Sequence, residues 1–121
     1  MTGPKQIFGK QAEDLACNFL QNQGYVILER NFRTRFSELD IIARHGDTLV
    51  FLEVKARKTL SRGTPREAIT PVKQQRIVKA ASWYLAHHRL DQIRVRFDVV
   101  AIVDTSGKIA IDLIQNAFQV D

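Results

Sequence analysis

The stretch Glu38–Arg57, which reads ELDIIARHGDTLVFLEVKAR, decides the fold of this chain of 121 residues. Residues 38–44 and 48–56 are rich in β-branched and other apolar side chains, which favour strands. The segment His45-Gly46-Asp47 between them is typical of a tight turn. The stretch therefore predicts a β-hairpin.

The position of the turn determines which side chains oppose each other across the hairpin. It places Asp40 opposite Glu53 and Glu38 opposite Lys55, with opposed Cβ atoms about 5 Å apart. Because side chains alternate between the two faces of a strand, these four share one face. The other face is apolar and is expected to pack in the core, through Leu39, Ile41, Leu52 and Val54.

Three carboxylates and one lysine on one patch are a costly arrangement, because like charges raise each other's pKa. A divalent cation removes this cost, and Mg²⁺ prefers one or two carboxylates while keeping several waters. Such an ion polarises a phosphate and activates water, while a lysine orients that water or stabilises negative charge. The patch therefore predicts phosphodiester hydrolysis with Mg²⁺ or Mn²⁺. The alternative is a plain salt bridge between Glu38 and Lys55 on a solvated face, and a one-residue slip would separate the cluster.

Apolar periodicity outside the hairpin predicts two helices and three more strands. Thr70-Pro71, a capping residue followed by proline, marks the start of the second helix. The expected elements, in chain order, are a helix at about Lys10–Gln23, a strand from Tyr25 toward Phe32, the hairpin, a helix from Pro71 to near His87-His88, and strands at Val95–Val103 and Ile109–Ile114. The order α-β-β-β-α-β-β predicts one α/β domain over residues 1–121, a mixed sheet flanked by helices.

Positive charge is concentrated between Lys55 and Lys79. This segment holds eight basic residues against one acid, Glu67, in a chain of net charge +5, so the rest of the chain is net negative. Such a distribution indicates a polyanion partner, although a solvated basic face is the alternative. Besides Lys55, the candidate phosphate-binding residues are Arg57, Lys58, Arg62, Arg66, Lys73, Arg76 and Lys79.

Several other classes of protein are excluded. Cys17 is the only cysteine, which fits a reducing cytosol. No apolar stretch is long enough to cross a bilayer, and residues 1–10 do not resemble a signal peptide. The sequence has no phosphate-binding glycine loop, no cysteine pair for zinc and no nucleophile elbow. We expect a cytoplasmic protein that has no membrane partner.

The segments Glu38–Ala43 and Phe51–Arg57 resemble the PD-(D/E)xK nuclease superfamily. The chain is more closely similar to the YraN family, small bacterial proteins related to archaeal Holliday-junction resolvases. An acid 13 residues before the acid-x-lysine tripeptide, and matching flanks along nearly the whole chain, carry the resemblance. It implies a restriction-endonuclease-like fold and a Mg²⁺-dependent or Mn²⁺-dependent endonuclease.

The resemblance also implies a role for individual residues. Asp40 and Glu53 would be metal ligands, Lys55 the catalytic lysine, and Glu13 the helix glutamate that completes the site. Gln74 matches a position that is often polar in related nucleases. Its place on the helical stripe of the second helix indicates that it faces the sheet, and the alternative is a partly buried first-turn residue.

Three further positions qualify the resemblance. Glu38 would contact the metal ligands without binding the metal itself, or it would pair with Lys55. Ser37 and Ala12 stand where the family usually has glycine, and neither change removes a functional group. Serine in place of glycine at position 37 would shift the turn that leads into the strand, and with it the direction of the Glu38 side chain.

Other polar and aromatic residues have competing interpretations. Trp83 and Tyr84 either stack on bases or belong to the core, which is the commoner outcome for a helix stripe. Adjacent His87 and His88 fit the end of a helix better than a metal site. Asp98 is either a further ligand or a buried acid bonded to backbone or to an arginine, and it is left out of the site.

Three functions are therefore considered. The first is a divalent-metal-dependent endonuclease acting on DNA rather than RNA, on branched or structured DNA by analogy with the resolvases, and as a homodimer if it resolves junctions. The second is a nucleic-acid-binding module of nuclease fold that works with a protein partner and does not cleave. The third is an interaction protein that does not bind nucleic acid.

Overall fold

The computed structural model describes residues 4–58 and 69–119, with side chains from residue 10 onward. Its elements are α1 (Pro4–Asn22), β1 (Tyr25–Arg33), β2 (Glu38–His45), β3 (Thr48–Arg57), α2 (Pro71–His87), β4 (Arg94–Thr105) and β5 (Lys108–Ile114). The predicted order α-β-β-β-α-β-β and the α/β class are confirmed. Neither described helix is long and apolar enough to cross a membrane.

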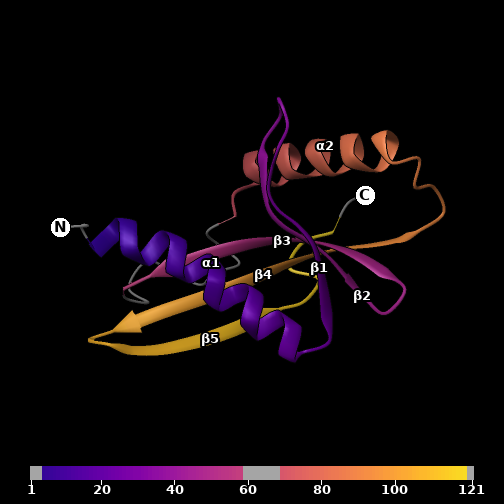
Figure 1. Ribbon diagram of the computed structural model, residues 1–121. Coiled ribbons are helices and arrows are strands. Elements are labelled where there is room, and N and C mark those ends of the chain that lie inside the picture. Colours follow the sequence, from indigo (N-terminus) through magenta and orange to yellow (C-terminus); the bar gives the residue numbers. More distant parts are fainter. Residues whose placement is uncertain (1–3, 59–68, 120–121) are drawn as a thin grey trace.

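The strands form one mixed sheet in the order β1-β2-β3-β4-β5. β3 and β4 are parallel, joined through α2, and the other neighbouring strands are antiparallel. Figure 1 shows α1 crossing one face of the sheet, while α2 lies on the other side near the connection between β1 and β2. The sheet is therefore covered by a helix on each face.

Two apolar clusters, one on each face, hold the layers together. Along β3, Leu49 and Phe51 pack in the cluster that contains α2, whereas Val50 and Leu52 pack in the cluster that contains α1. A strand buried on both faces reads as a continuous apolar run, which explains the sequence of β3. The buried residues of α1 in this core are Ala12, Ala16, Cys17 and Leu20, and those of α2 are Ile77, Ala80, Ala81 and Tyr84.

The predicted hairpin register is confirmed where the two strands pair. Ile41 lies opposite Leu52 and His45 opposite Thr48, with the turn at Gly46, whose φ is +63°. The expectation that Leu39 shares a face with Ile41 is wrong, because Leu39 packs in the α2 cluster. Pairing with β3 stops at Ile41, and β2 then twists with β1 toward α2 (Figure 1), which turns Leu39 to that side.

The element boundaries differ from the expected ones by a few residues. α1 begins at Pro4, six residues before Lys10. A proline in the first turn of a helix costs no hydrogen bond, because a backbone N–H at that position has no partner within the helix. α2 begins as expected, with Oγ1 of Thr70 accepting the N–H of Lys73 at 3.2 Å. β2 includes His45, which the sequence had placed in the turn.

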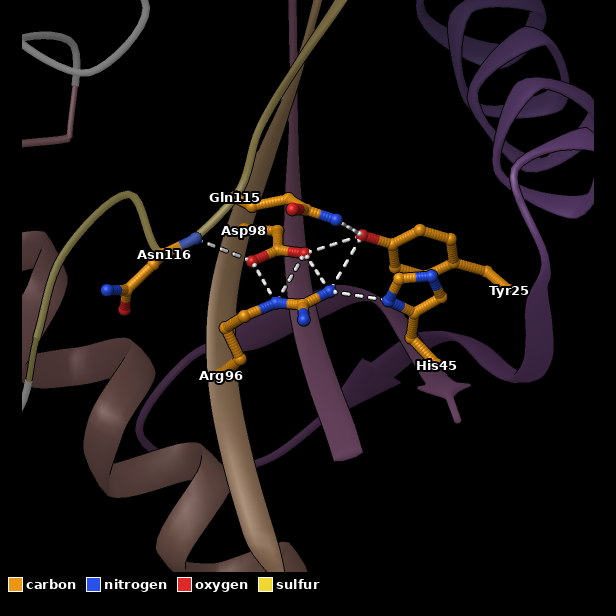
Figure 2. A network of polar contacts seen from close by, with 6 residues as sticks. All are labelled: Tyr25, His45, Arg96, Asp98, Gln115 and Asn116. Carbon is orange, nitrogen blue, oxygen red and sulfur yellow. Dashed lines mark hydrogen bonds and ion pairs between the residues drawn. The ribbon is translucent and has the colours of Figure 1, made fainter. Parts of the chain in front are cut away.

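A partly buried polar network links β1, β2 and β4 to the segment that follows β5 (Figure 2). Asp98 is 1% exposed, and its carboxylate accepts hydrogen bonds from Nε of Arg96 at 2.9 Å, the hydroxyl of Tyr25 at 2.8 Å and the N–H of Asn116 at 2.9 Å. The ring of His45 stacks on Tyr25 and lies 3.1 Å from Arg96. The interpretation of Asp98 as a buried acid bonded to an arginine and to backbone is confirmed, and His45 contributes where no role was expected.

Replacing Asp98 by asparagine is expected to lower the free energy of unfolding by about 2–4 kcal/mol, because it leaves the Arg96 charge without its buried partner. Urea unfolding followed by circular dichroism measures the change. Asp112→Asn removes the same charge from an exposed position on β5 and should shift stability by less than about 0.5 kcal/mol. Equal small effects of the two variants would show that the network does not stabilise the fold.

Candidate active site

The candidate site lies where β2 and β3 separate. The β2–β3 ladder ends at the pair Ile41 and Leu52, although β3 continues to Arg57 alongside β4. Beyond that pair, Oδ2 of Asp40 accepts the backbone N–H of Val54 at 2.9 Å. A side chain of β2 thus takes over the hydrogen bond that a backbone carbonyl would otherwise accept, and this fixes the Asp40 carboxylate over β3.

Asp40 and Glu53 form a partly desolvated pair of acids. Burial, and then the neighbouring charge of Glu53, raise the pKa of Asp40 to about 7, against the opposing effect of the Val54 N–H. Glu53 is only 7% exposed. The carboxylates of Asp40 and Glu53, which the hairpin register predicted to be opposed, therefore interact through their charges. They lie one residue past the last hydrogen-bonded pair of the two strands.

Two lysines lie beside this pair of acids. Nζ of Lys73, from the first turn of α2, lies 2.9 Å from Oε1 of Glu53. Burial lowers the pKa of Lys55, and hydrogen bonding with Lys73 and the charge of Lys73 lower it further. Burial also lowers the pKa of Lys73, but hydrogen bonds with Lys55 and Glu53 outweigh burial, so the Lys73 pKa ends above its ordinary value. Lys73 therefore holds its proton more firmly than Lys55 does.

The sequence interpretation placed Lys73 among the residues that hold phosphates and did not connect it with the acids. The signal was present in the spacing of α2, because Lys73 precedes the buried residues Ile77, Ala80 and Tyr84 by four, seven and eleven positions. Lys73 thus lies at the start of the buried stripe of the helix, and its long side chain carries the ammonium group to the sheet.

Gln74 and Glu38 interact elsewhere. Nε2 of Gln74 donates to the carbonyl of Ile69 at 3.0 Å, so its amide is bonded to the segment before α2, which agrees with the alternative of a partly buried first-turn residue. Glu38 forms its ion pair with Arg33 at 3.0 Å, because β1 and β2 place these two residues opposite each other. The alternative pairing of Glu38 with Lys55 is therefore wrong.

Glu13 approaches the site from the opposite face of the sheet. Its side chain is 23% exposed and lies 3.6 Å from Arg30 of β1, which also pairs with Asp14 at 2.8 Å. The charge of Glu13 contributes to the raised pKa of Asp40, so the two carboxylates interact. α1 and α2 thus both present a charged side chain to Asp40, an acid from one side and a lysine from the other.

The remaining basic candidates are spread around the start of α2 and the end of β3. Lys58, Arg76 and Lys79 are exposed, and Arg57 is half-buried at the end of β3. Arg62 and Arg66 lie outside the described residues. Of the aromatic candidates, Tyr84 is in the core, as its helical spacing indicated, while Trp83 is 40% exposed and stacks on His87.

The donor set fits a hard divalent cation held by two protein carboxylates. Among residues 10–58 and 69–119, no three Asp, Glu, His or Cys side chains converge closely enough to enclose a metal ion. Asp40 and Glu53 are adjacent, and Mg²⁺ commonly uses one or two carboxylates and completes its shell with water and substrate oxygens. A cation there would also relieve the repulsion that raises the pKa of Asp40.

Comparison with known proteins gives one consistent family. Residues 12–102 match the model of the uncharacterised protein family UPF0102. The chain is 52% identical over 121 residues to a UPF0102 protein of Desulforapulum autotrophicum, with both chains covered in full. It is 45% identical to a UPF0102 protein of Syntrophotalea carbinolica, covering 100% of this chain and 98% of the relative. A UPF0102 protein of Geobacter sulfurreducens is 46% identical over 94% of this chain and 90% of its own.

Replacing Asp40 by asparagine is expected to stabilise the metal-free protein at pH 8 by about 1–3 kcal/mol, because a partly buried charge beside Glu53 is removed. In the wild type the folded-state pKa of about 7 lies above the ordinary 3.8, so the folded state holds this proton more tightly. Its stabilising effect is complete below the ordinary pKa and is lost as pH rises toward 7. Urea unfolding at pH 5 and pH 8 with a chelator measures both variants.

The difference between the two pH values isolates Asp40 from other titrating groups. The wild type should lose stability relative to Asp40→Asn from pH 5 to pH 8, whereas Asp47→Asn, in the exposed turn, should follow the wild type. A stability difference between Asp40→Asn and wild type that stays constant with pH would mean that the pKa of Asp40 is not raised.

Proposed function

The chain belongs to the UPF0102 family, and from its site we propose that it is a divalent-metal-dependent endonuclease that hydrolyses phosphodiester bonds of DNA. The observation that carries this proposal is the pair of partly desolvated carboxylates, Asp40 and Glu53, with the amine of Lys55 beside them. An acid pair can hold a divalent ion that assists phosphodiester hydrolysis, and a lysine beside it can orient water or stabilise developing negative charge. The resemblance to the PD-(D/E)xK superfamily supports the same reading.

Asp40 and Glu53 would hold the cation in this proposal. When bound, a divalent ion supplies Lewis-acid polarisation of the phosphate and activation of the attacking water. The protein holds Asp40 in place through the N–H of Val54, so this ligand is positioned before any cation arrives. Glu13, whose charge acts on Asp40, adds negative potential that favours a cation.

Lys55 would act directly on the reacting groups. Its lowered pKa brings it closer to neutral pH than an exposed lysine, which suits a group that orients water and exchanges a proton with it. In its charged form it stabilises negative charge that develops on the phosphate oxygens. We assign Gln74 no direct part, because its amide is bonded to the carbonyl of Ile69.

DNA would be held by the exposed basic residues around the start of α2. Arg76 and Lys79 are exposed on α2, the helix that also carries Lys73 to Glu53, so phosphate contacts and the site share one element. Such contacts give affinity without sequence readout. A preference for branched DNA, and the homodimer that junction resolution needs, extend the proposal by analogy with the resolvases.

A second function is favoured by the ion pair between Lys73 and Glu53. A lysine on a would-be ligand, and no enclosing set of three acids among the described residues, suit a module that binds nucleic acid without cutting it. Such a module would act with a protein partner. Cleavage assays separate the two functions.

Wild type with Mg²⁺ or Mn²⁺ is expected to cleave labelled linear, single-stranded or four-way-junction DNA, and Lys55→Ala is expected to reduce the rate at least about 100-fold. The loss is expected because the amine proposed to orient water and to stabilise developing negative charge is removed. Gel analysis of time courses measures the rate, and the preferred substrate identifies the DNA structure that is recognised.

Arg94→Ala is the matched control for this experiment. Arg94 is exposed and lies opposite Thr48, at the other end of the strands from Lys55, so its loss removes one charge away from the site. Its cleavage rate should equal that of the wild type. Intact DNA binding without cleavage by any form would reject the nuclease and favour the binding module.

Replacing Arg76 by alanine is expected to weaken binding to DNA of any sequence and to lower the slope of log affinity against log salt by about 1. The reason is the loss of one phosphate contact and its released counterion. Fluorescence anisotropy with a chelator present, from about 50 to 200 mM salt, measures binding without cleavage. Binding of wild type that does not depend on salt would exclude the phosphate contacts, and no binding of DNA by wild type would exclude both nucleic-acid functions.

A further inference from the structure

The ion pair between Lys73 and Glu53 joins two elements that are far apart in sequence. Glu53 lies on β3 and is nearly buried, while the Lys73 side chain is 37% exposed and comes from the first turn of α2. The Nζ to Oε1 distance of 2.9 Å is that of a charge-assisted hydrogen bond. A buried carboxylate needs such a partner, because an unpaired charge in this environment is costly.

The position of Lys73 is determined by the helix and not only by its charge. Thr70 caps the N-terminus of α2 by accepting the N–H of Lys73 itself, and Pro71 occupies the first helical position. Ile77, one turn further on, is buried against the sheet. The backbone of Lys73 is therefore held in place, while its side chain has four carbons of reach and an exposed outer part.

We propose that Lys73 is a built-in counterion that competes with the divalent cation for Glu53. This inference rests on the proposed function, since it takes Asp40 and Glu53 as the metal ligands. Without a cation, the ammonium of Lys73 neutralises Glu53 and holds α2 on the sheet. When a cation binds the two carboxylates, the ammonium leaves Glu53, because the ion takes its ligand and repels its charge.

The competition has a consequence for metal affinity. The binding free energy of the cation is reduced by the free energy needed to displace Lys73, and a unit charge a few ångströms from the ion adds repulsion. The site would therefore bind metal more weakly than two desolvated acids do on their own. The same lysine stabilises the metal-free fold. Lys73 therefore raises the stability of the protein without metal and lowers its affinity for metal.

The test measures Mn²⁺ affinity directly, by calorimetry, with no DNA present. Lys73→Met removes the charge and keeps a side chain of similar length, and it is expected to bind Mn²⁺ at least about tenfold more tightly than wild type. Lys73→Arg keeps the charge and should bind like wild type. Arg94→Ala, which removes one charge at the other end of the sheet, should also bind like wild type.

Thermal unfolding gives a second readout, which reports stability without metal as well as stabilisation by Mn²⁺. With a chelator, Lys73→Met should melt below wild type, because Glu53 loses its partner, and Mn²⁺ should raise its melting temperature more than that of wild type. Equal Mn²⁺ affinity and equal Mn²⁺-induced shifts in wild type and Lys73→Met would overturn the competition while leaving the metal site intact. No Mn²⁺ binding by either protein would overturn both this inference and the metal dependence of the proposed function.

Discussion

β3 is hydrogen-bonded to β4 from Thr48 to Arg57, but to β2 only as far as Leu52. A buried backbone N–H needs an acceptor, so the end of the ladder must be closed by another group. The carboxylate of Asp40 closes it by accepting the N–H of Val54. That single hydrogen bond brings an acid of β2 next to Glu53 of β3, and the charge pattern of the site follows from it.

The two helices add opposite charges to the site. α1 brings Glu13 toward Asp40 and adds negative charge, whereas α2 brings Lys73 onto Glu53 and cancels it. The apolar clusters on the two faces determine how far each helix can approach, because they hold the helices against the sheet. The electrostatic balance of the site therefore depends on core packing on both sides of β3.

Local patterns allowed much of this to be predicted from the sequence. The turn at Gly46 determined the hairpin register, and extending that register one step past Ile41 and Leu52 predicted that Asp40 lies near Glu53. The sequence did not reveal the twist that turns Leu39 to the other face, because twist depends on where pairing stops. It also assigned the inward polar position of α2 to Gln74 instead of Lys73, since neighbouring helical residues differ by only about 100° in direction.

The buried Asp98 and the partly buried Asp40 show why one acid is assigned to stability and the other to function. Asp98 is surrounded by donors, with Arg96, Tyr25 and a backbone N–H all bonded to its carboxylate, so its charge is compensated within the fold. The carboxylate of Asp40 accepts the N–H of Val54, and the charge of Glu53 opposes its ionisation. A fold gains nothing from leaving a desolvated acid beside another acid, and such an imbalance is typical of functional sites. The physical difference between these two environments therefore supports a ligand at Asp40 and argues against one at Asp98.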